Sequence, residues 1–131
     1  MKLIFVAEDA IVGMICGLLL IGSTGRWFSL KLSPWIYIAA FVIFIFFIIL
    51  DIAHEISDLT THFGFIMLSL IHNIIDVVLS LAFISHFSGW KIPYITSTIV
   101  PYLQSEVVIF YVGVFLVVAN GIWLLVFPMT Y

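Results

Sequence analysis

Four long apolar segments follow one another along the chain, at residues 3–25, 35–57, 63–87 and 106–127. Each approaches or exceeds the roughly 20 residues that a helix needs to cross the hydrocarbon core of a bilayer. Transmembrane strands would alternate between apolar and polar residues, whereas residues 41–50 are apolar throughout. The pattern predicts an all-α integral membrane protein, a bundle of four transmembrane helices with both termini on the same side. Residues 1–131 form a single membrane domain in this interpretation.

Helix-breaking residues lie between these segments. Ser33-Pro34 favours a helix start, because proline is well accommodated in the first turn. Pro93 and Pro101 prevent residues 88–105 from forming one long helix. Aromatic residues of the kind found at membrane surfaces lie in the same stretch: Trp90, Tyr94 and Tyr102. The sequence therefore predicts an interfacial loop at 88–105.

Composition and charge agree with a membrane environment. The chain is 65% hydrophobic and 8% charged, whereas soluble domains carry about 25% charged residues. The expected partners are therefore lipid and other integral membrane subunits, with no nucleic acid. Arg26, Lys31 and Lys91 fall in the first and third loops, which the positive-inside rule assigns to the cytoplasm. Both termini and the turn at 52–62 are then predicted on the extracytoplasmic side.

Five acidic and histidine residues follow the apolar part of the second segment. If the helix continues past residue 51, their side chains fall within an arc of about 100°. Carboxylate and imidazole groups together suit copper, iron and other transition metals, so these residues are metal-ligand candidates. Two alternatives stay open: a helix end that becomes polar as it leaves the bilayer, and an entrance that collects protons. The five residues are Asp51, His54, Glu55, Asp58 and His62.

The third segment carries polar residues at intervals of three and four, which places them on one helix face. His72, Asn73 and Asp76 lie deep in the segment, where a charged side chain costs at least about 2.5 kcal/mol. A His72–Asp76 pair could orient a metal ligand, relay a proton, or only join helices. Antiparallel packing brings polar residues of the first and fourth segments to the same half of the bundle. The predicted proton path or buried polar cluster is Glu8, Asp9, His72, Asn73, Asp76 and Asn120, with Asp51 and His54 beside it.

Three spacings are similar to those of known metal and haem proteins. His72 and His86 are separated by thirteen residues, similar to the haem-ligating pairs of diheme cytochromes b, which implies haem b. Leu68 to His72, followed by Asp76, is similar to the haem-bearing helix of succinate dehydrogenase anchors. Asp58-x3-His62 with His72 is similar to the copper ligands in the third subunit of membrane methane and ammonia monooxygenases, although the second interval is shorter here. Copper, iron and haem b are therefore the candidate cofactors.

No motif in the chain names a reaction, so no catalytic residue is assigned. Thin loops and nearly uniform apolar helices are typical of a small accessory subunit of a larger membrane complex, of respiratory or oxidative type. Gly13 and Gly17 form a ridge of small residues that allows another helix to approach closely. The alternatives are a metal- or haem-binding membrane subunit that uses the acidic and histidine residues, and a proton-conducting subunit that uses Asp76.

Overall fold

The computed structural model describes residues 2–30, 32–57 and 63–130, and their side chains apart from those of 2–7, 55, 57, 63–66 and 126–130. Throughout these ranges the regular structure is helical, which confirms the all-α prediction. Four long helices are α1 (Lys2–Thr24), α2 (Pro34–Ser57), α3 (Phe63–Ser88) and α5 (Glu106–Thr130). Between α3 and α5 lie the short helix α4 (Ile95–Thr98) and the 3₁₀ helix η1 (Val100–Gln104).

Within the described ranges, three of the long helices are long and apolar enough to cross a membrane. These candidate spans are Pro34–His54 in α2, Met67–Ser88 in α3 and Glu106–Leu125 in α5. Three such helices are typical of a multi-pass membrane protein, as predicted. The fourth predicted span falls on α1, which carries Glu8 and Asp9, and it stays a prediction at this point.

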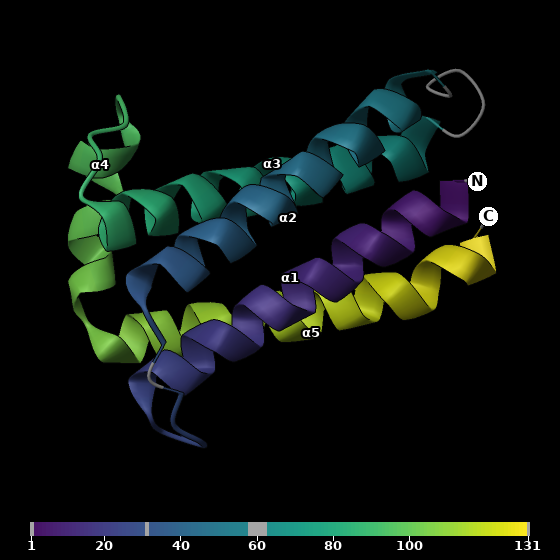
Figure 1. Cartoon of the computed structure of the whole chain (residues 1–131). Coiled ribbons are helices and arrows are strands. Elements are labelled where there is room, and N and C mark those ends of the chain that lie inside the picture. The colour runs from purple at the N-terminus through teal and green to yellow at the C-terminus, as the bar shows by residue number, and fades with distance from the viewer. Residues whose placement is uncertain (1, 31, 58–62, 131) are drawn as a thin grey trace.

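The long helices run antiparallel in an open bundle (Figure 1). The closest packing is between α1 and α5, and α2 packs against both α1 and α3. Helices α3 and α5 are not a closely packed pair, so the bundle is open along one edge. The first turns of α1 and the last turns of α5 lie at one end, and α4 and η1 lie at the other (Figure 1). We call these the terminal end and the loop end.

Glycines set the distance between α1 and α5. A Cβ atom on Gly17 would lie 2.6 Å from the backbone oxygen of Gly113, and one on Gly113 would lie 2.8 Å from the oxygen of Gly17. A Cβ on Gly13 would meet the Asn120 side chain at 2.6 Å. The predicted small-residue ridge is therefore a helix contact, and it fixes the register of α1 against α5.

The loop-end half of the bundle has an apolar core. Phe41 of α2 and Phe83 of α3 are fully buried, and their rings stack with centroids 5.3 Å apart. Tyr37 and Phe87 stack in the same way at 4.6 Å. Buried side chains from α1, α2 and α5 complete this apolar layer: Cys16, Leu20, Phe44 and Leu116. Its aromatic rings fill the space between the helices on this side.

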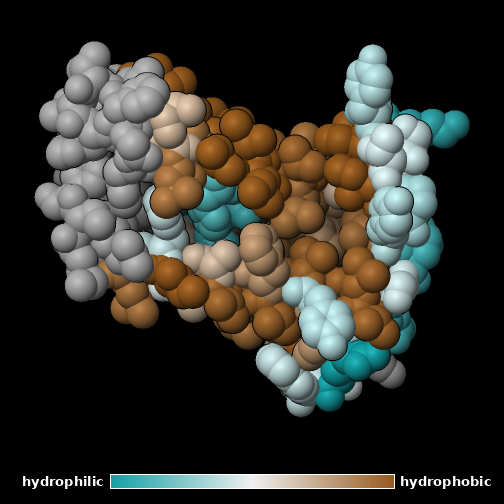
Figure 2. Space-filling model, turned by 180° about the vertical axis from the view of Figure 1, so that it is seen from behind, coloured by the Kyte–Doolittle hydropathy of each residue, from teal (hydrophilic) through white to brown (hydrophobic). Residues whose placement is uncertain are grey.

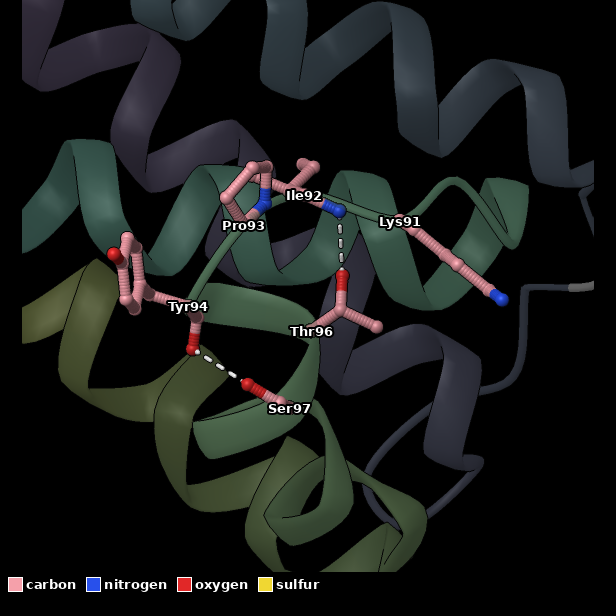
Figure 3. A pocket seen from close by; sticks show the side chains of 6 residues that line it. All are labelled: Lys91, Ile92, Pro93, Tyr94, Thr96 and Ser97. Carbon is pink, nitrogen blue, oxygen red and sulfur yellow. Dashed lines mark hydrogen bonds between the residues drawn. The ribbon is translucent and has the colours of Figure 1, made fainter.

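Hydroxyl groups hold the connection after α3. Gly89 adopts a positive φ of 78°, which ends the helix. The buried Ser85 hydroxyl donates to the Trp90 carbonyl at 2.6 Å, and the Ile92 N–H donates to the Thr96 hydroxyl at 2.7 Å. The second of these bonds is drawn in Figure 3, where Lys91 and Tyr94 point in opposite directions. The segment predicted as an interfacial loop thus contains short, hydrogen-bonded turns of helix.

Candidate functional site

All four long helices contribute polar side chains to the terminal half of the bundle. We call six of these residues the polar cluster, and five of them are no more than 2% exposed. The sixth, His72, has a side chain that is 15% exposed. Burial of so many polar groups is costly unless they bind one another. The polar cluster consists of Asp9 (α1), Asp51 (α2), His72, Asn73 and Asp76 (α3) and Asn120 (α5).

Two aspartates from different helices form the first half of the polar cluster. The side chains of Asp9 and Asp51 lie within hydrogen-bonding reach of each other. The Asn73 amide donates to Oδ2 of Asp51 at 3.0 Å. An ionised carboxylate only accepts hydrogen bonds, so a bond between two carboxyl groups requires a proton on one of them. Two carboxyl groups at this separation can therefore share one proton.

His72 and Asp76 form the second half of the polar cluster. Nε2 of His72 lies 3.2 Å from Oδ2 of Asp76, one helical turn away, and 3.4 Å from Oδ1 of Asn120. The Asn120 amide nitrogen donates to the Leu116 carbonyl at 2.8 Å, which turns its oxygen toward His72. A hydrogen on Nε2 can donate to Oδ1 of Asn120, whereas Asp76 lies close to the ring without accepting a hydrogen bond from it. Nδ1 is then the second nitrogen of the ring, available for another contact.

The polar cluster reaches only halfway along the bundle. Asp51 lies within one turn of the end of its candidate span, whereas Asp76 lies near the middle of the span in α3. Beyond Asp76, the Ser80 hydroxyl donates to the Asp76 carbonyl at 2.7 Å, and the apolar layer of Phe41 and Phe83 follows. The arrangement can pass a proton between the terminal end and the middle of the span, but its polar groups do not continue to the loop end.

Two further predicted site residues, Glu8 and His54, are described by the structure and lie next to the polar cluster. Glu8 is partly exposed and takes no part in the contacts that join the cluster. His54 lies close enough to Asp51 to interact with it electrostatically. The Glu55 side chain, Asp58 and His62 lie outside the described residues. The metal-ligand hypothesis for this set stays a prediction; among the described residues, no three His, Cys, Asp or Glu side chains are placed to hold a metal ion.

His86 is separate from the polar cluster. It lies fourteen residues after His72, or about 21 Å along the same helix. Its ring makes edge contacts with Phe83 and Phe87, at centroid distances of 6.5 and 5.1 Å. The predicted pairing of His72 and His86 as haem ligands is not tested by these contacts, which only place His86 beside the apolar layer.

The sequence analysis missed Trp123, whose ring stacks on that of His72 with centroids 5.5 Å apart and planes at 27°. The spacing of Asn120 and Trp123 could have indicated this contact, because residues three apart lie on the same face of a helix. Trp123 and His72 belong to a groove of about 350 Å³ along the open edge between α3 and α5. The groove is lined by Leu68, Ile71, His72, Ile75, Ala119, Ile122 and Trp123. Figure 2 shows hydrophilic residues in a hollow that is bordered by hydrophobic ones.

A second hollow, of about 330 Å³, lies at the loop end (Figure 3). Lys91 is the charged residue in its lining, which also includes the exposed Tyr94 ring. These residues come from the short connection after α3, so the hollow is far from the polar cluster (Figure 1).

No known protein family, curated protein or solved structure matches this chain.

Proposed function

We propose that this chain is a proton-binding subunit of a larger membrane assembly. In this proposal the polar cluster binds a proton at Asp9 and Asp51, near the terminal end of the bundle, and passes it toward Asp76 near the middle of the α3 span. The contact between the buried carboxyl groups of Asp9 and Asp51 carries the proposal, because two carboxyl groups can bond to each other only when one of them holds a proton. Ionisable groups inside a membrane span are in general associated with proton relays and ligand sites.

The second half of the polar cluster supports proton transfer. A histidine that contacts a carboxylate can exchange a proton with it, since imidazole titrates near neutral pH. His72 and Asp76 are in direct contact, and the adjacent residue Asn73 binds Asp51. One short stretch of α3 therefore links the carboxyl pair to the imidazole.

A larger assembly is proposed because the polar groups stop at mid-span. A protein that moves protons across a membrane needs a polar path from both sides, and the apolar layer occupies the loop-end half. A neighbouring subunit or a bound molecule would have to receive the proton. The exposed apolar face of α2, which includes Val42, Phe46 and Ile49, offers such a subunit a large contact surface. The proposal thus extends the accessory-subunit interpretation by giving the subunit a role in proton binding.

The proposal includes a fourth span and an orientation. Because α1 packs along α5 in a register set by Gly17 and Gly113, it would cross the bilayer together with α5. Arg26 and Lys91 lie at the loop end, which the positive-inside rule places in the cytoplasm. The terminal end, and with it the entrance to the polar cluster, would then be extracytoplasmic.

The test is infrared spectroscopy of the protein in lipid nanodiscs at neutral pH. We expect a carbonyl band from a protonated carboxylic acid, and we expect the Asp51→Asn variant to lose it. Asparagine has the same shape as aspartate and can still donate to Asp9, so the variant should fold.

A further inference from the structure

The groove between α3 and α5 opens the polar cluster to the hydrocarbon of the membrane. Its lining includes exposed apolar side chains of two candidate spans, such as Ile71 and Ile122. His72 is the ionisable residue in the lining, and it lies between the edge and the middle of the α3 span. A molecule dissolved in the bilayer can therefore reach the imidazole without crossing water.

The hydrogen bonds of His72 determine which chemical group of a ligand in the groove could bind to it. Nε2 faces the oxygens of Asp76 and Asn120 and carries the hydrogen, so Nδ1 of the neutral ring is an acceptor. The matching group on the ligand is a donor, such as a hydroxyl.

The shape of the groove favours one ring with a short apolar chain. Its volume of about 350 Å³ is near the lower end of the range for small-molecule pockets, about 300–1,000 Å³. The stacked rings of His72 and Trp123 provide a flat aromatic wall, against which another ring can pack.

We propose that the groove between α3 and α5 binds a lipid-soluble phenol, a class that includes hydroquinones, with its hydroxyl donating to Nδ1 of His72. The inference rests on the proposed function, since it supplies the polar cluster with a partner molecule that carries an exchangeable proton. The proposal concerns the binding of the phenol to the groove and includes no electron transfer.

The test is photo-crosslinking in nanodiscs with a 4-alkylphenol that carries a diazirine in its chain. Mass spectrometry should find the label on the groove residues of α3 and α5. Free 4-hexylphenol should compete about three- to tenfold better than hexylbenzene, which corresponds to one net hydrogen bond. Equal competition by hexylbenzene would mean that the groove holds any apolar chain, and it would overturn the proposal, as would label found only elsewhere.

A matched pair of variants locates the site. Ile75 lines the groove, and its neighbour Ile74 is exposed but does not. Ile75→Trp should abolish the crosslink, and Ile74→Trp should retain it. Equal labelling of both variants contradicts the proposal. The infrared band of the carboxyl proton should be unchanged in Ile75→Trp, so failure of ligand binding can be distinguished from failure of the proton-binding proposal.

Discussion

At the scale of single residues, the polar cluster is a set of partners drawn from separate helices. Burial of a carboxyl group without a partner costs several kcal/mol, so a lone aspartate at the position of Asp51 would destabilise the bundle. Asn73 and Asp9 both bind Asp51, and His72 contacts Asp76. The buried groups thus stabilise one another only when α1, α2 and α3 are assembled in this register.

Gly17 provides a prediction at this scale. A Cβ atom at Gly17 would lie 2.6 Å from the backbone oxygen of Gly113, which cannot rotate away. We expect Gly17→Ala to push α1 from α5 and to lower the free energy of unfolding by about 1–3 kcal/mol, the usual effect of overpacking. Unfolding in mixed detergent micelles, followed by circular dichroism, measures the change.

The matched control is Gly121→Ala on α5. A Cβ there would meet only the flexible Met14 side chain, at 3.8 Å. Alanine is the better helix former, so this variant should be unchanged or more stable by about 0.5–1 kcal/mol. Equal destabilisation by the two alanines would show that the close contact of α1 and α5 does not limit the packing.

The residues of the polar cluster could be predicted from the sequence, but their pairing could not. Polar positions inside apolar helices stand out, and the three- and four-residue intervals place His72 and Asp76 on one face. The contact between Asp9 and Asp51 depends on how α1 and α2 are rotated and shifted against each other, which the spacing of residues within each segment does not specify. Trp123 was missed because an aromatic residue in an apolar helix gives no compositional signal.

At the scale of helices, the apolar pattern predicts well where a regular element occurs and that this element is a helix. The helices found in the structure and the predicted all-α class agree, since long uninterrupted apolar runs leave few alternatives. The contents of residues 88–105 were harder to predict. Two prolines exclude a long helix there, but α4 and η1 depend on hydroxyl contacts such as that of Ser85 with Trp90. Such contacts arise only after folding.

The arrangement of helix ends yields a second prediction. The exposed residues Ser29, between α1 and α2, and Gln104, in η1, both belong to connections at the loop end. We expect Ser29→Cys and Gln104→Cys to react with a membrane-impermeant maleimide from the cytoplasmic side alone. The native Cys16 is fully buried, so the parent chain should stay unlabelled. Labelling of the two positions from opposite sides would refute the crossing of the membrane by both α2 and α3, which lie between them in the chain.

At the scale of the whole molecule, the bundle divides into a polar terminal half and an apolar loop half. Asp9, Asp51 and Asn120 lie in the first, and Phe41 and Phe83 fill the second. A proton held at mid-span must be passed to something else, and the open edge between α3 and α5 and the apolar face of α2 are the available contact surfaces.

This division predicts that the chain is isolated with other membrane proteins. Gentle-detergent purification from the native membrane should yield it together with at least one larger integral membrane chain in fixed stoichiometry, as measured by mass spectrometry. A chain that is isolated alone, and is stable alone, would contradict the assembly part of the proposed function. Elemental analysis of the same sample tests the metal-ligand hypothesis that includes Asp58 and His62.

The most direct measurement for the central claim is the infrared spectrum of the carboxyl groups at neutral pH. The account predicts a protonated carboxylic acid band in the wild-type protein and in Glu106→Gln, which neutralises an exposed carboxylate at the start of α5. It predicts that Asp9→Asn and Asp51→Asn each lack the band, since either change removes the need for a shared proton. A wild-type protein without the band, or a band that survives both substitutions, would contradict proton binding by Asp9 and Asp51.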